Sequence, residues 1–141
     1  MPYVISVSSE ARVGVVLLSG YVTGQTVVEG ARALHSRPEW APGFGEVWDF
    51  LDAQEVDFSP EGMDLLVGYT FDSSDRIGAN RVAIVIDRDV VGILLHLYRA
   101  LTVDLDRAYE SFVTLEAAAL WLGIDADLLR SVHREARGDA A

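Results

Sequence analysis

The amino-acid sequence predicts an α/β fold, with a five-stranded mixed, mostly parallel sheet in a single domain and helices packed on the sheet. Stretches rich in β-branched residues alternate with helical stretches along most of the chain, and this order favours a parallel sheet covered by helices. Half of the 141 residues are hydrophobic, which is enough for one substantial core at this length. We expect the domain to cover residues 1–132, with an extra C-terminal helix, and residues 133–141 to form a frayed tail.

The first part of the chain predicts a hairpin followed by a helix. Residues 3–8 and 12–19 are both β-rich and only a short break separates them, so the first strand should run antiparallel to the second. Residues 22–36 carry apolar side chains at helical spacing. Thr23 is a candidate N-cap for this helix, and Pro38 marks its end.

The middle of the chain predicts two units of strand and helix. Residues 46–51 form the first of these strands, and a helix follows over 59–70. A polar loop over 72–80 leads into 81–86, a nearly continuous apolar run of the kind that is covered on both faces of a sheet. Residues 89–103 predict the second helix, which is unusually apolar.

The last part predicts one strand and two helices. The strand covers 107–113, and a helix follows over 114–123, with Thr114 as its N-cap and Gly123 as its C-terminal stop. Asp125 is a candidate N-cap for the final helix.

Composition excludes several kinds of chemistry. The chain has no cysteine and no lysine, so disulfides, thiolate sites and lysine-based catalysis are absent. A net charge of −11 disfavours binding to nucleic-acid phosphates. No apolar run is long enough to span a bilayer, and the N-terminus lacks the pattern of a secretory signal, so we expect a cytoplasmic protein. The sequence contains no nucleotide-binding glycine motif, so we expect no cofactor.

Several short segments resemble one protein family. They comprise "GYVT" (20–23), "PEWAPGF" (38–44), "VWDF" (47–50), "RVAIV" (81–85), Phe112 and "AALWL" (118–122). In this order of elements the chain resembles the STAS domains, and more closely the SpoIIAA-like branch that is grouped with STAS and Sec14-type domains. The likeness covers residues 3–123. It implies a compact, non-enzymatic domain that contacts proteins or holds a small ligand.

Ser59 lies near the place where phosphorylated STAS regulators carry a switch serine. Those regulators have an Asp-Ser-Ser-Gly motif at the start of the helix after the third strand, whereas this chain has "FSPEG" (58–62). Ser59, Pro60 and Glu61 instead match the N-cap, first turn and dipole preferences of an ordinary helix start. We expect Ser59 to be mainly a cap, and phosphorylation of Ser59 stays open because a helix N-terminus accommodates phosphate.

Four aspartates lie at the ends of two of the predicted strands. Asp49 and Asp52 come at the end of one strand, and Asp87 and Asp89 at the end of another. Because ligands of parallel sheets bind beyond the carboxyl ends of the strands, these residues predict an acidic pocket that could hold a divalent metal. The alternative is that acidic residues are abundant here and occupy loops, and we therefore expect no metal.

The three histidines are predicted to be ordinary surface or half-buried residues. His35, His96 and His133 fall on three separate predicted helices and have no spacing typical of metal ligands.

The predicted helix over 89–103 has more apolar surface than one buried stripe requires. Val91, Leu94, Leu95 and Tyr98 belong to this surface. The helix could lie entirely in the core, form a homodimer interface, or wall an apolar pocket like that of Sec14-type carriers.

These observations rank three functions. The first is a non-catalytic STAS-like interaction or regulatory domain that contacts a protein partner and forms a homodimer. The second is a carrier or sensor of a small apolar ligand. The third is a metal-dependent enzyme with Asp49, Asp52, Asp87 and Asp89 as its pocket.

Overall fold

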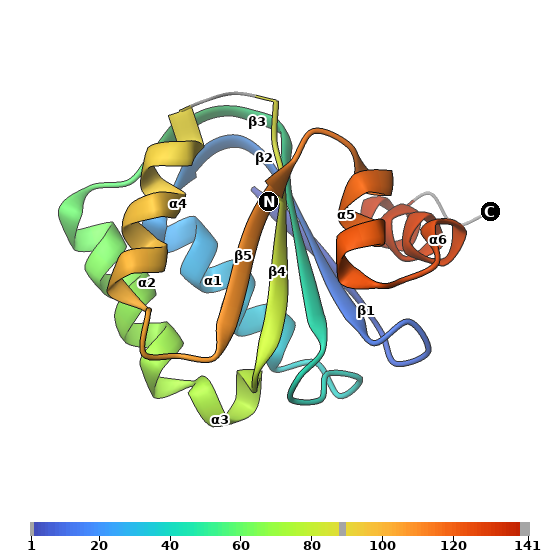
Figure 1. Cartoon of the computed structure of the whole chain (residues 1–141). Coiled ribbons are helices and arrows are strands. Elements are labelled where there is room, and N and C mark those ends of the chain that lie inside the picture. The colour runs from blue at the N-terminus through green and yellow to red at the C-terminus, as the bar shows by residue number, and fades with distance from the viewer. Residues whose placement is uncertain (1, 88–89, 139–141) are drawn as a thin grey trace.

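The computed structural model describes residues 2–87 and 90–138, and these ranges form one five-stranded sheet with helices on both faces (Figure 1). The strands lie in the order β1-β2-β3-β4-β5. Their bounds are β1 Tyr3–Ser8, β2 Val13–Thr23, β3 Gly45–Asp57, β4 Asn80–Val85 and β5 Arg107–Phe112. β1 is antiparallel to β2, and every other neighbouring pair is parallel. The predicted α/β class and mixed sheet are confirmed.

The helices form two layers. α1 (Gly24–His35), α2 (Pro60–Asp72) and α4 (Val90–Leu101) cover one face, and the short α3 (Ser74–Ile77) follows α2. Each of these three helices joins two neighbouring parallel strands, and since such crossovers are right-handed they come to lie on the same face. The opposite face carries α5 (Leu115–Leu122) and α6 (Ala126–Arg137) (Figure 1).

β3 contributes side chains to both layers. Trp48 and Phe50 belong to the core beneath α1 and α2, whereas Val47 belongs to the core beneath α5 and α6. This division follows from the alternation of side chains along a strand. The sheet is thus buried on both faces, as the apolar strand sequences predict.

The predicted helix starts are confirmed by their hydrogen bonds. The Thr23 side chain accepts a bond from the Thr26 N–H, and Thr26 Oγ1 accepts one from the Thr23 N–H, which completes a capping box. The Thr114 hydroxyl accepts from the Ala117 N–H at 3.2 Å, and Asp125 Oδ1 accepts from the Leu128 N–H at 3.0 Å. Side chains that satisfy free N–H groups therefore fix where these helices begin.

β3 is longer than predicted. It continues to Asp57, because β2 accompanies it as far as Thr23, whereas β4 pairs with it only from Glu46 to Asp49. Two irregularities in the β2–β3 register accompany this extension, the first opposite the segment between Asp49 and Asp52. The far part of β3 thus has a neighbour on one side among the described residues, and the sheet opens beside it.

The frayed C-terminal tail predicted over residues 133–141 begins too early in the sequence. α6 continues to Arg137, and the left-handed Gly138 follows it as C-cap. Val132 and Ala136 lie one helical turn apart and are both buried, so the apolar face of α6 extends past the predicted end at residue 132. The predicted loop over 72–80 also differs, since it contains α3.

Within residues 2–87 and 90–138, no helix combines the length and apolar character needed to cross a membrane.

Candidate functional site

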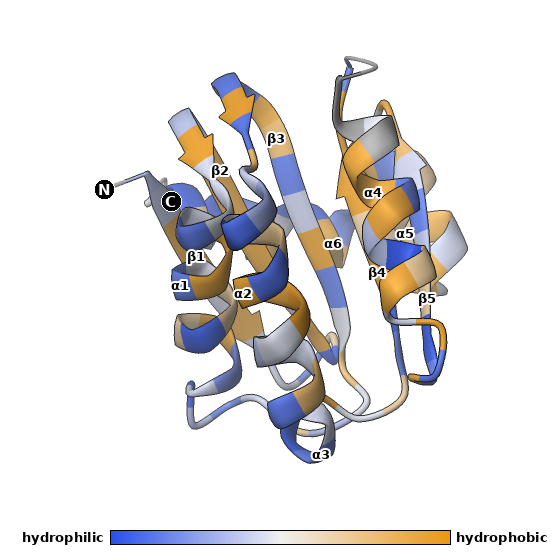
Figure 2. Cartoon of the chain, turned by 90° about the vertical axis from the view of Figure 1, so that its left-hand side faces the viewer, coloured by the Kyte–Doolittle hydropathy of each residue, from blue (hydrophilic) through white to orange (hydrophobic). Residues whose placement is uncertain are grey.

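A cavity of about 90 Å³ lies between the sheet and the helices α1, α2 and α4. Figure 2 shows α2 and α4 standing on either side of β3, with hydrophobic residues along α4. The wall of the cavity is mainly apolar and includes residues of the helices α2 and α4 and of the strands β3 and β4. Its apolar residues include Val27, Phe50, Val56, Phe58, Met63, Leu66, Ile77, Val82, Ile84, Leu94 and Leu95.

One end of the cavity contains a buried carboxylate, Glu46, at the start of β3. Its side chain is 1% exposed and accepts four hydrogen bonds. Arg107 Nη2 lies at 2.8 Å, Asn80 Nδ2 at 2.9 Å and His35 Nε2 at 3.1 Å from Glu46 Oε2. Trp48 Nε1 donates to the other oxygen, Oε1, at 2.9 Å. The carboxylate is therefore saturated by groups from α1, β3, β4 and β5.

These contacts keep Glu46 ionised. Burial alone would raise its pKa, but the charges of Arg107 and His35 and the bonds that His35 and Trp48 donate hold the pKa well below its ordinary value. Burial would lower the pKa of Arg107, and Glu46 raises it beyond the ordinary value. Glu46 and Arg107 thus form a buried ion pair. Removing either partner should destabilise the fold strongly, because the other charge would stay buried without compensation.

Arg107 extends the network to Tyr98 and Thr70. Its Nε donates to Asn80 Oδ1 at 2.9 Å and its Nη1 donates to the Tyr98 hydroxyl at 3.1 Å. Tyr98 and Thr70 hydroxyls lie 2.5 Å apart, and Thr70 Oγ1 donates to the Leu66 carbonyl. Burial raises the pKa of Tyr98, which stays a neutral phenol. Within the described residues, no buried side-chain nitrogen or oxygen lacks a hydrogen-bond partner.

The predicted pocket helix, α4, contributes part of this wall. Leu94 and Leu95 are half-buried and line the cavity, and Tyr98 is buried at its polar end. The side chain of Val91 lies outside what the structure describes. Among the side chains of α4 that the structure describes, the large apolar ones that are exposed are Leu97 and Leu101, at 47% and 45%.

The predicted acidic pocket has no counterpart in the described residues. Asp49 points to the opposite face of the sheet, where its Oδ2 accepts from His133 Nε2 of α6 at 2.7 Å. Its Oδ1 accepts from the Leu51 N–H at 2.8 Å. Asp52 and Asp87 are exposed, and Asp89 lies outside the described residues. Over 2–87 and 90–138, no three histidine, aspartate or glutamate side chains are placed to hold one metal ion.

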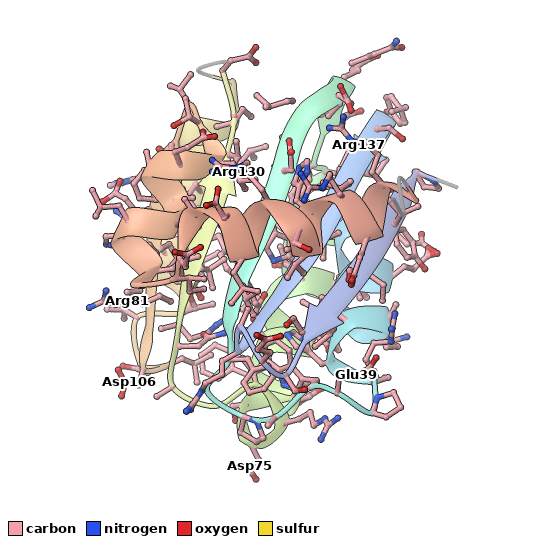
Figure 3. The ribbon with its side chains drawn as sticks, turned by 90° about the vertical axis from the view of Figure 1, so that its right-hand side faces the viewer. Glu39, Asp75, Arg81, Asp106, Arg130 and Arg137 are labelled. Atoms are coloured by element: carbon pink, nitrogen blue, oxygen red, sulfur yellow. The ribbon has the colours of Figure 1, made fainter. Side chains whose placement is uncertain are left out.

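Figure 3 shows α6 crossing the strands on the face opposite the cavity, with Arg130 and Arg137 on its exposed side. Arg130 forms ion pairs with Glu116 of α5 and with Asp127. The bond between Asp49 and His133 joins α6 to the central strand β3, whereas Arg130 and Arg137 of α6 lie at the surface.

The histidine prediction is wrong for His35. This side chain is 3% exposed, and in addition to Glu46 it contacts the Tyr69 hydroxyl, 2.8 Å from Nδ1. The sequence did carry a signal for a buried polar partner. Glu46 is the first residue of the predicted strand 46–51, and alternation places it on the same inward face as Trp48 and Phe50. Arg107, which completes the ion pair, had no comparable signal.

Ser59 is an exposed N-cap. Its Oγ accepts from the Gly62 N–H at 3.0 Å, and Pro60 and Glu61 begin α2. The predicted role as a cap is confirmed.

Comparison with known proteins identifies the fold. No protein-family model and no curated protein matches the chain. Among solved structures, it is similar to an uncharacterized protein of the DUF3478 family with a SpoIIAA-like fold from Shewanella loihica PV-4. That match has a TM-score of 0.55 and 14% sequence identity, and it covers 85% of this chain and 94% of the other.

A second similar structure is that of the anti-sigma factor antagonist SpoIIAA in its unphosphorylated form, with a TM-score of 0.49 and 15% identity. It covers 86% of this chain and 99% of that one. The first match, the mixed sheet and its strand order agree with the STAS resemblance read from the sequence. The chain therefore has a SpoIIAA-like fold.

Proposed function

We propose that this protein is a non-catalytic binding domain that holds a small apolar ligand between its sheet and α1, α2 and α4, as a carrier or a sensor. The observation that carries this proposal is the cavity of about 90 Å³ with its largely apolar wall. A space of this size holds roughly three water molecules. Since apolar walls offer water few hydrogen bonds, an apolar ligand that displaces this water gains the hydrophobic free energy.

Helix α4 links the cavity to the surface of the protein. Leu94 and Leu95 line the cavity, and Leu97 and Leu101 of the same helix are exposed. A ligand that moves α4 would change the apolar surface presented to a partner. The proposed domain therefore acts as a regulatory module of the STAS type whose input is the ligand.

A second function, protein contact through a homodimer, is favoured by the same exposed residues. Leu97 and Leu101 lie one helical turn apart, so they form one apolar face on α4. Light scattering after size-exclusion chromatography should then give a dimer that Leu97→Asp dissociates and that Leu65→Asp, at an exposed site on α2, leaves intact. A monomer at micromolar concentration would contradict the dimer.

Phosphorylation of Ser59 stays a separate prediction. The residue is exposed, and intact-mass measurement of protein purified from its native host would reveal the added phosphate. Unmodified protein under all growth conditions would contradict it.

The cavity is tested with 1-hexanol, which joins an apolar chain to a neutral hydroxyl. In a titration followed by ¹H–¹⁵N correlation NMR, we expect saturable shifts for amides around the cavity, such as those of Ala31, Thr70 and Ile84. Amides of α6, on the far face of the sheet, serve as the internal control. Shifts spread evenly over the surface, or none, would contradict the proposal.

A further inference from the structure

We infer that the cavity takes apolar ligands that carry no anionic group, which excludes fatty acids and phospholipids as its occupants. This inference rests on the proposed function, and it concerns which ligands that site accepts. It follows from the charges at the deep end of the cavity and from the net charge of the protein.

The deep end already contains its own anion. Glu46 is 1% exposed and accepts from Arg107, Asn80, His35 and Trp48. A ligand carboxylate at this end would have to share those donors with Glu46 or replace it. Two carboxylates on one set of donors repel each other strongly in a buried site.

The cation at this end is not available to a ligand. The Arg107 side chain is 7% exposed, and its guanidinium donates to Asn80, Tyr98 and Glu46. In many anion sites an arginine presents two parallel N–H groups to the ligand, whereas here Nε, Nη1 and Nη2 each donate to a different residue of the protein. A ligand anion would therefore be desolvated without gaining a cation of its own.

The outer end of the cavity opens to solvent. The lining residues Val56, Phe58, Leu94 and Leu95 are only partly buried, so the cavity meets solvent between the end of β3 and α4. Glu55 and Asp57, which flank Val56 on β3, are exposed carboxylates that point to the other face of the sheet. An anionic head group left at this opening would still meet the negative potential of a protein of net charge −11.

The remaining polar groups at the deep end are neutral. The Tyr98 hydroxyl already bonds to Thr70 and Arg107, whereas the Tyr109 hydroxyl bonds to Thr102 and keeps acceptor capacity for a neutral donor. An alcohol can therefore place its hydroxyl there without adding a charge. Small hydrocarbons, alcohols and similar uncharged molecules are the class that this cavity accepts.

The test compares 1-hexanol with hexanoate, which has the same chain and is anionic at pH 7.5, in the same NMR titration of the full chain. We expect hexanoate to bind at least about tenfold more weakly than 1-hexanol. Hexanoate binding as tightly as 1-hexanol would overturn the inference and leave the proposed function standing. If neither compound binds, the proposed function fails and the inference fails with it.

A substitution at the deep end sharpens the comparison. Glu46→Gln removes the resident anion and leaves Arg107 without its ion pair, so the preference for 1-hexanol over hexanoate should fall by about tenfold or more. Glu39→Gln, at an exposed ion pair with Arg37, is the matched control and should keep the original preference. An unchanged preference in folded Glu46→Gln protein would overturn the inference, and the comparison in the unaltered chain decides it if that variant does not fold.

Discussion

Glu46 and Asp49 lie on the same strand, β3, and each accepts a hydrogen bond from a histidine on an opposite face of the sheet. His35 Nε2 of α1 lies 3.1 Å from Glu46, and His133 Nε2 of α6 lies 2.7 Å from Asp49. Residues three apart on a strand face opposite sides, so this spacing sends one carboxylate into each layer. The central strand thereby joins both helical layers through polar contacts as well as through its apolar core.

Removing the buried carboxylate should destabilise the fold strongly. Glu46→Gln leaves Arg107 buried without its ion pair, and we expect the free energy of unfolding in urea to fall by about 3–5 kcal/mol. Glu39→Gln also breaks a glutamate–arginine pair, but both side chains there are exposed, and little change should follow. Equal effects of the two substitutions would contradict the account of the buried network.

The same carboxylate should make stability depend on pH. Because the pKa of Glu46 is lowered in the folded state, its contribution is present above the ordinary glutamate pKa and is lost as the pH falls toward the lowered value. We therefore expect the difference in unfolding free energy between the unaltered chain and Glu46→Gln to be largest near pH 7 and to narrow below about pH 4. Urea titrations from pH 7 to pH 3 measure it, and a constant difference would argue against an ionised Glu46.

Two glycines of α1 should respond oppositely to alanine. A Cβ at Gly24 would lie 2.7 Å from the Gly62 backbone of α2, so Gly24→Ala must push the two helix starts apart and should cost about 1–3 kcal/mol. A Cβ at Gly30 would meet Trp48 and Val16 at an ordinary 3.5 Å, and Gly30→Ala should stabilise the helix by up to about 1 kcal/mol. Thermal unfolding of the two variants distinguishes them, and a destabilised Gly30→Ala would show that the contact between α1 and the sheet is tighter than described.

The bond between α6 and β3 should contribute to stability. His133→Ala leaves the buried Asp49 without the donor at its Oδ2, and we expect a loss of about 1–3 kcal/mol in the free energy of unfolding. His96→Ala, at an exposed position of α4, is the control and should change stability by less than about 0.5 kcal/mol. If both substitutions are neutral, packing alone holds α6 against the sheet.

The features predicted well from the sequence are those that depend on neighbouring residues. Thr23, Ser59 and Thr114 identify the starts of three helices, because a cap bonds to an N–H only three residues away. The alternation of strands and helices likewise predicts the class and the mixed sheet.

The features that were missed depend on contacts between distant residues. Glu46 and Arg107 are 61 positions apart, and no local pattern pairs them. His35 becomes a buried residue only because Glu46 and Tyr69 lie beside it in the fold. Asp49 and Asp52 lie three positions apart on β3, but Asp49 points to α6 and Asp52 to solvent. Their closeness in sequence therefore does not create an acidic pocket.

A comparison of two tryptophan substitutions on α4 tests the proposed ligand cavity most directly. Leu95 lines the cavity, so Leu95→Trp should fill it and weaken 1-hexanol binding by at least about tenfold in the NMR titration. Leu97, two residues further along the same helix, is 47% exposed, and Leu97→Trp should bind 1-hexanol as the unaltered chain does. Binding that persists in Leu95→Trp, or that is lost equally in both variants, would contradict a ligand held beneath α4.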